Sequence, residues 1–158
     1  MTRTPTFFHC RDHIVGPAFT AVVLCAGRIL AVQEEGRDVW IHGVEAGALA
    51  AHGVDLKEAL EAFRETFTKT LNDLAMDAGA FDDFRRRVLE LFSRIDSSTE
   101  DDWQFAADSE RIAWPRRPDE LCDPVERVRF VQVFEEREPN SDRHFEVTGA
   151  SIGASPTA

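Results

Sequence analysis

The sequence DLKEALEAFRETFTKTLNDL, from Asp55 to Leu74, predicts an amphipathic helix and is the strongest structural signal in the chain. Asp55 suits the N-cap position because its carboxylate can accept hydrogen bonds from first-turn amides, and Glu58 follows where a capping box needs an acidic side chain. Gly79 is a suitable C-terminal stop. The apolar side of this helix consists of Leu56, Ala59, Leu60, Phe63, Phe67, Leu71 and Leu74.

A second amphipathic helix is predicted directly after Gly79. Its apolar residues recur at helical spacing, whereas the three consecutive arginines at 85–87 are turned away from much of that stripe. The apolar faces of the two helices must be buried against another part of the chain, such as a sheet. The apolar residues of this second helix are Phe81, Phe84, Val88, Leu91, Phe92 and Ile95.

The residues before the first helix predict short strands. The run FTAVVLCAG, from Phe19 to Gly27, is apolar and rich in β-formers, and the same character resumes after Arg28. This pattern predicts a hairpin that turns at Gly27. We expect a second turn at residues 35–37, a third strand at residues 38–44 and a short extended segment at residues 48–53.

The C-terminal half predicts one further strand. Residues 97–102, SSTEDD, predict a polar acidic loop, and residues 103–107 predict a short helix or an ordered connection. Prolines exclude a long regular element between residues 114 and 124. Partial alternation over residues 125–136 predicts the last strand, and the aperiodic residues 138–158 predict a mostly disordered tail.

Together these elements predict a single α+β domain. We expect a small antiparallel or mixed sheet with two amphipathic helices packed on one face. The 158 residues are enough for one sizeable core but not for two. We therefore expect the domain to span residues 1–137, with a helix-and-loop elaboration over residues 76–126.

Acidic side chains outnumber basic ones in this chain. There are 29 acidic and 18 basic residues, a formal net charge of −11. This charge repels phosphate backbones and anionic lipids, so we expect neither nucleic acid nor a membrane as partner. The longest apolar stretch, Ala21–Ala26, is too short to cross a bilayer, and the N-terminal residues do not form a signal peptide. We therefore expect a cytoplasmic protein.

The three cysteines are far apart in sequence. Cys10, Cys25 and Cys122 form no CxxC pair, and buried or idle thiols are the simplest interpretation. His9, Cys10 and His13 form an H-C-x-x-H cluster that could hold part of a zinc site, although a closed site needs four ligands. We expect neither a bound metal nor another cofactor.

The stretch VEAGALAAHGVDLKEALEAF, from Val44 to Phe63, resembles the HicB-like family of small domains. The features that carry the resemblance are a turn at Gly47, a short strand that ends at Gly53 and a helix that begins Leu-Lys-Glu-Ala. The resemblance covers residues 28–75, and residues 127–135 match as a fourth strand.

This resemblance implies a partial ribonuclease-H-like sheet with helices on one face. It also implies an antitoxin that masks a small RNA-cleaving toxin. The sequence departs from the family in two places. No DNA-binding segment follows Glu136, so autorepression is not expected, and residues 76–126 form an unusually long insertion. That insertion is either a partner-binding elaboration or extra cover for the sheet.

A ribonuclease-H-like fold also directs attention to carboxylates that could bind divalent metal ions. The candidate catalytic residues are Asp38, His42 and Asp55, although Asp55 is better explained by its role as a helix cap. His42 and His52 lie on neighbouring predicted strands, where Asp38 or Glu45 could orient them. A small metal-dependent hydrolase or nuclease is therefore an alternative function. The competing interpretation is that these histidines are structural or surface residues.

Tryptophans at positions 40, 103 and 114 are candidates for partner binding. Trp40, Trp103 and Trp114 could anchor an interface, because tryptophan concentrates binding energy there, or could pack in the core. The acidic residues 97–102 could meet a basic partner or remain solvated. We expect a non-enzymatic, homo-oligomeric interaction domain that binds a small basic protein or itself. A standalone homo-oligomer of another role is left open.

Overall fold

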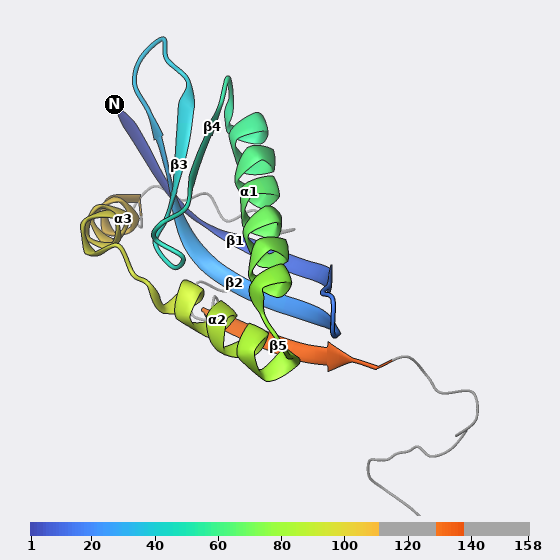
Figure 1. The fold of residues 1–158 in the computed structure, drawn as a ribbon. Helices are drawn as coiled ribbons and strands as arrows, with labels where there is room; N and C mark the ends of the chain where they lie inside the picture. The colour runs from blue at the N-terminus through green and yellow to red at the C-terminus, as the bar shows by residue number, and fades with distance from the viewer. Residues whose placement is uncertain (111–128, 138–158) are drawn as a thin grey trace, which may run out of the picture.

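The computed structural model describes residues 1–110 and 129–137, which form an antiparallel sheet and three helices (Figure 1). The predicted α+β fold is confirmed. In chain order the elements are β1 (Thr2–Val15), β2 (Thr20–Gln33), β3 (Val39–Gly43), β4 (Ala50–Gly53), α1 (Leu56–Asp77), α2 (Phe81–Ser93), α3 (Ser97–Glu110) and β5 (Phe130–Glu136).

β2 is the central strand of the sheet. β1 pairs along its whole length, from Thr2 opposite Gln33 to Val15 opposite Thr20. On the other side of β2, β5 pairs with residues 20–26 and β3 pairs with residues 29–33, so these two strands lie one after the other along β2. β4 pairs with β3.

The predicted hairpin at Gly27 is wrong, because β2 runs through this residue without a turn. Gly27 is required by packing: an added Cβ would lie 2.7 Å from Cε1 of Phe8 on β1. The hairpin is formed instead by β1 and β2, and β1 was not predicted from the sequence. Pro5 and several charged or histidine residues interrupt the apolar pattern of β1, whose buried residues include Phe8 and Ile14.

α1 begins and ends close to its predicted bounds. The side chain of Asp55 accepts a hydrogen bond from the Glu58 backbone N–H at 2.8 Å. The Glu58 carboxylate accepts in return from the N–H of Val54 at 3.4 Å, one residue before the cap. The C-cap is Ala78, one residue before the predicted stop at Gly79. The buried residues of α1 are Ala59, Phe63, Phe67, Leu71 and Ala75.

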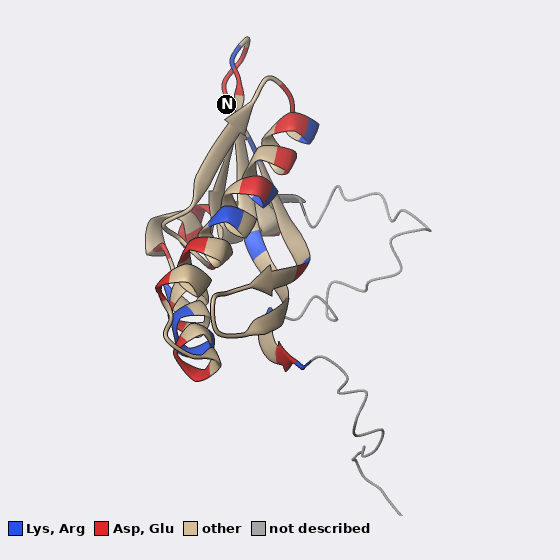
Figure 2. Cartoon of the chain, turned by 45° about the vertical axis from the view of Figure 1, so that its right-hand side comes forward, with Lys and Arg blue, Asp and Glu red and all other residues tan. Residues whose placement is uncertain are grey.

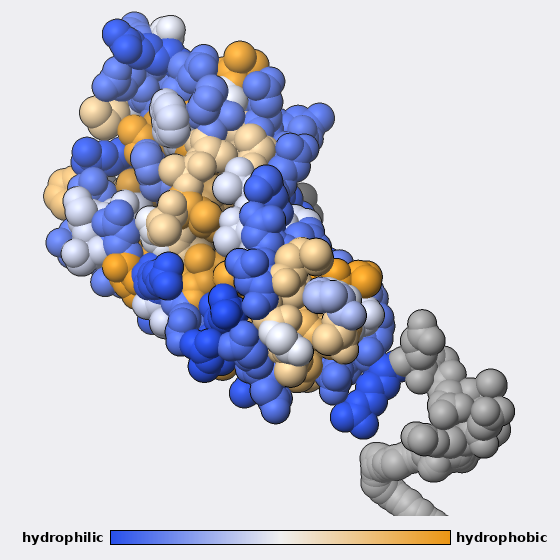
Figure 3. Space-filling model, viewed as in Figure 1, coloured by the Kyte–Doolittle hydropathy of each residue, from blue (hydrophilic) through white to orange (hydrophobic). Residues whose placement is uncertain are grey.

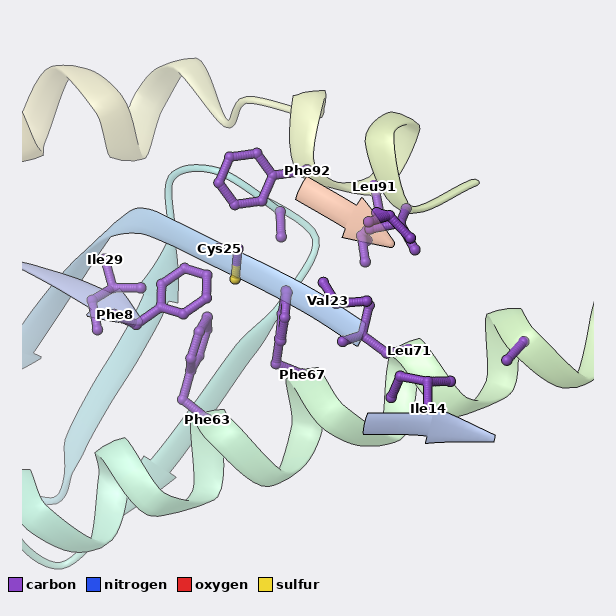
Figure 4. Close-up of a cluster of buried hydrophobic side chains, with 14 of the residues drawn as sticks. Phe8, Ile14, Val23, Cys25, Ile29, Phe63, Phe67, Leu71, Leu91 and Phe92 are labelled. Carbon is purple, nitrogen blue, oxygen red and sulfur yellow. The ribbon is translucent and has the colours of Figure 1, made fainter. Parts of the chain in front are cut away.

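α1 and α2 cover one face of the sheet, and the hydrophobic core lies between them and the strands (Figure 4). The ring of Phe8 meets the rings of Phe63 and Phe67 edge-on, each at a centroid distance of 5.2 Å. The predicted α2 is confirmed, with Phe84, Val88, Leu91 and Phe92 buried. Ile95, the last residue of the predicted stripe, lies beyond the end of α2 and is 41% exposed. Seen from this side, the surface is mostly polar, with a strip of apolar side chains between α1 and α3 (Figure 3).

The predicted loop at residues 97–102 is wrong, because these residues form the start of α3. Asp96 caps this helix, and its Oδ1 accepts from the Thr99 N–H at 3.0 Å. Acidic side chains near a helix N-terminus interact favourably with the helix dipole, so the run that resembles a solvated loop is also suited to a first turn. Residues 103–107, predicted as a short helix or an ordered connection, are helical and belong to the longer helix α3.

The remaining elements agree with the sequence prediction where the structure describes them. The turn after β2 contains Gly36 at a φ of 70°, and β3, β4 and β5 lie within their predicted ranges. Trp114, Cys122 and the predicted tail at residues 138–158 lie outside the described residues. Within the described residues, no helix is both long and apolar enough to span a membrane.

Candidate functional site

The second face of the sheet, which we call the open face, is the candidate functional surface. Side chains alternate along a strand, so the neighbours of core residues point to this side. α3 packs over part of the open face, next to Arg28 of β2. Other parts of it carry exposed aromatic side chains: Trp40 is 45% exposed and Phe134 is 50% exposed.

Beneath α3 lies a buried ion pair between Arg28 and Glu45. The Arg28 Nε lies 3.2 Å from both carboxylate oxygens, and its Nη2 donates to Oε2 at 2.8 Å. The backbone N–H of Arg28 also donates to Oε1, at 2.9 Å. The two side chains are only 8% and 3% exposed. Such a pair is stable only when well hydrogen-bonded, and here both partners are.

Residues of α3 complete this cluster. Glu100 Oε2 lies 2.5 Å from Nη2 of Arg28, and the Arg28 guanidinium carbon lies 5.4 Å from the centre of the Trp103 ring. The Trp103 ring also contacts Phe7 edge-on at 5.6 Å, and its Nε1 donates to the Thr6 carbonyl at 3.2 Å. Trp103 therefore packs against the sheet, as in the core-packing interpretation of this residue.

The electrostatics of Arg28 support a structural role for the cluster. Burial acts to lower the pKa of Arg28, but hydrogen bonds to Glu45 and Glu100 outweigh this effect and raise it above its usual value. Arg28 therefore stays charged and fully paired. The cluster attaches α3 and the segment after β3 to the sheet. No local pattern links positions 28, 45 and 100, so this cluster cannot be recognised from the sequence alone.

A groove of about 550 Å³, which we call the Trp40 groove, lies at the other end of the open face. Trp40 lies opposite Val32 on β2 and His52 on β4. Its ring stacks on that of His42 at a centroid distance of 6.1 Å and packs against His52 at 4.8 Å. The groove is lined by Val32, Glu34, Arg37, Asp38, Trp40 and His42.

The groove combines an aromatic floor with carboxylates at the β2–β3 turn, which extends beyond the helices in Figure 1. Asp38 Oδ2 lies 3.6 Å from Nδ1 of His52, with both side chains more than half exposed. Glu34 lies 3.5 Å from the Arg37 guanidinium. Figure 2 shows acidic and basic positions together at this tip and also along the helices.

Of the three candidate catalytic residues, Asp38 and His42 both line the Trp40 groove, whereas Asp55 lies apart from them at the start of α1. Asp55 Oδ1 is occupied by its capping bond, Asp38 pairs with His52, and His42 stacks on Trp40. His42 and His52 do lie on neighbouring strands as expected, but Glu45 binds Arg28 instead of orienting them. Over residues 1–110 and 129–137, no group of three or more His, Cys, Asp and Glu side chains is placed to hold a metal ion.

The H-C-x-x-H cluster at the N-terminus is not a compact site. His9, Cys10 and His13 lie on β1, where Cys10 points to the helix-covered face and the two histidines point to the open face. His13 Nδ1 lies 3.4 Å from the Glu136 carboxylate on β5. The three side chains do not converge on one point, because the segment is a strand, in which side chains alternate between faces.

Comparisons of the chain with protein-family models, with curated proteins and with solved structures gave no match. The HicB-like resemblance therefore stays a prediction from the sequence.

Proposed function

We propose that this protein is a non-enzymatic interaction domain that binds a basic protein, and that the Trp40 groove receives an arginine or lysine side chain of that partner. The observation that carries the proposal is an exposed tryptophan beside two carboxylates in one groove. A cation over a tryptophan face is attracted by the ring. The groove carries two carboxylates, Asp38 and Glu34, against one guanidinium, Arg37, so its charge complements a cation.

The net charge of the chain supports a basic partner. A formal charge of −11 attracts a basic protein at long range and raises its association rate. The HicB-like resemblance supports the same class of partner, a small toxin-like protein. The short strand before Gly53 and the helix after Asp55 lie where the resemblance requires them.

Site-specific photo-cross-linking tests the proposal. A photoreactive phenylalanine analogue at position 42, inside the groove, should cross-link a basic protein in the native cell. The matched control carries the same analogue at position 61, an exposed residue of α1 on the other side of the sheet. Equal cross-linking from both positions, or an acidic product, would contradict the proposal.

Binding of the identified partner then measures the role of Trp40. Trp40→Ala should weaken binding by about 2 kcal/mol, or about thirtyfold in Kd, if the ring is an interface anchor. Asp38→Asn should weaken binding less and reduce its salt dependence. Met76→Ala, at a 64% exposed residue of α1, is the matched control and should leave Kd unchanged.

Self-association is a second part of the proposal. β1 is a strand of 14 residues at the edge of the sheet, and no other described strand pairs with its outer edge. Phe130 and Phe134 of β5 are 40% and 50% exposed on the open face. Light scattering should show a dimer that Phe134→Asp weakens and Met76→Asp does not. A monomer at high concentration would contradict this part.

The alternative of a metal-dependent hydrolase is tested by calorimetric titration with magnesium, manganese and zinc. If Asp38 contributed to such a site, its substitution by asparagine would weaken the measured metal affinity. Asp38 and His42 line the same groove, but Asp55 is engaged as the cap of α1, and the described residues hold no cluster of three ligand side chains there, which favours the binding function.

A further inference from the structure

Two cysteines lie opposite each other on β1 and β2, beside the core. Cys10 and Cys25 are direct partners in the antiparallel register, and both are free thiols. Opposite residues in such a pair have Cα atoms about 4.5 or 5.5 Å apart, and both values lie within the range of disulfides, about 4.4–6.8 Å. The register therefore gives the two residues a Cα separation compatible with a disulfide.

Both side chains point to the same face of the sheet. Residues directly opposite on neighbouring strands share a face, and Cys25 is 1% exposed within the core. Figure 4 shows its sulfur directed toward the rings of Phe8, Phe63 and Phe67. Cys10 is only half-buried, and its Sγ lies 4.0 Å from the carbonyl oxygen of Val23.

The two thiols differ in reactivity. A hydrogen bond with Cys10, together with burial, raises the pKa of Cys25 above its usual value. Cys25 therefore remains a protonated thiol. Because oxidation follows exposure, the half-buried Cys10 is the thiol that an oxidant reaches first.

We propose that Cys10 and Cys25 form an oxidation site, at which a hydroperoxide converts the thiol pair into a disulfide that joins β1 to β2. In the first step the Cys10 sulfur attacks the peroxide, the O–O bond breaks, and an alcohol or water leaves with the thiol proton. This produces a sulfenic acid at Cys10. The Cys25 thiol then gives its proton to the hydroxyl of the Cys10 sulfenic acid, the Cys25 sulfur attacks the Cys10 sulfur, the S–O bond breaks, and water leaves.

The electrons balance over these two steps. Two thiols lose two electrons and two protons, and one hydroperoxide is reduced to an alcohol or water plus one further water. The site lies on the helix-covered face and does not include the Trp40 groove. It therefore stands independently of the proposed function.

The full chain carrying Cys122→Ser tests the proposal, since the native Cys10 and Cys25 are then its only thiols. The folded protein is treated with hydrogen peroxide, unfolded and alkylated. We expect both thiols to be lost, the mass to fall by about 2 Da for the two hydrogens removed, and one cross-linked peptide pair to contain Cys10 and Cys25. Dithiothreitol should restore both alkylation sites.

Two results would overturn the proposal. One is a protein that keeps both alkylatable thiols after treatment. The other is a Cys10 that gains two or three oxygen atoms while Cys25 is still alkylated. Peroxide treatment in guanidinium is the control for the register, and an equal yield of disulfide there would show that the fold does not promote the bond. The variant Cys25→Ser/Cys122→Ser should instead accumulate a Cys10 sulfenic acid that dimedone traps.

Discussion

The two faces of the sheet differ in the side chains that they carry. The helix-covered face buries rings and aliphatic side chains, such as Phe8, Ile41 and Phe67. The open face carries the charged cluster of Arg28 and Glu45 under α3 and exposed aromatic rings elsewhere. The difference teaches that apolar burial stabilises the fold from one side, whereas the other side has specific polar contacts and surface suited to a partner.

The largest expected effect comes from the helix-covered face. Phe67→Ala should destabilise the protein by about 3–5 kcal/mol, because it leaves a cavity where the ring is only 2% exposed. Urea unfolding followed by circular dichroism measures the change. The matched control is Phe105→Ala at a 71% exposed ring of α3, which should stay within about 0.5 kcal/mol. Equal losses of unfolding free energy in the two variants would show that the ring on the helix-covered face contributes no more to stability than the exposed ring of α3.

The next effect comes from the charged cluster. Glu45→Ala should cost about 3 kcal/mol, because it leaves the buried Arg28 with only the partial compensation of Glu100. The double variant Arg28→Met/Glu45→Leu should recover most of this loss, since replacing both charges removes the unpaired one. Unfolding measurements on both variants test this. A double variant as unstable as the single one would mean that the charges themselves stabilise α3.

A smaller effect is expected at the start of α1. Asp55→Ala should cost about 1 kcal/mol, because the Glu58 N–H loses its acceptor. Asp73→Ala, which removes an exposed ion pair with Lys69 of the same helix, is the control and should cost about 0.5 kcal/mol or less. The two thermal midpoints would coincide if the cap contributed nothing.

The smallest effect is expected at the surface of α2. Hydrogen bonds from Arg86 and Arg87 lower the pKa of Asp83. A lowered pKa contributes stability that is present above the unfolded-state value, about 3.9 for aspartate, and is lost as the pH falls through the folded value. Asp83→Asn should therefore lower the thermal midpoint slightly at pH 7 and not at pH 2. Asp82→Asn is the control, and a pH-independent difference for Asp83 would contradict the ion pair.

The helices on the core side could be predicted from sequence because their signals are local. Asp55, Glu58 and the apolar residues that follow are all within one amphipathic segment, so the sequence predicts the cap and most of the buried stripe of α1. Leu56 of the predicted stripe is 43% exposed, and Ala75, which was not in it, is buried. The strand at residues 39–43 and the turn at Gly36 were foreseen for the same reason. Near-neighbour spacing decides whether such segments form a helix, a strand or a turn.

The open face was predicted less well because its contacts join distant positions. Trp40, His42 and His52 were identified as candidates, and the structure brings them together through the pairing of β3 with β4. The link between Arg28 and Glu100, separated by 72 residues, carries no local signal. The direct pairing of Cys10 with Cys25 depended on β1, a strand with too few apolar residues to be recognised.

The sequence by itself determined the α+β class and the two amphipathic helices, because short-range periodicity is a property of neighbouring residues. It also determined the acidic charge, which follows from composition alone. Only the tertiary structure decided that Gly27 makes room for Phe8, that residues 97–102 begin a helix, and that a charged pair holds this helix on the open face. The reason is physical. A glycine permits a turn or a close approach, and an acidic run suits a loop or a first helical turn, so that only the surrounding packing selects between them.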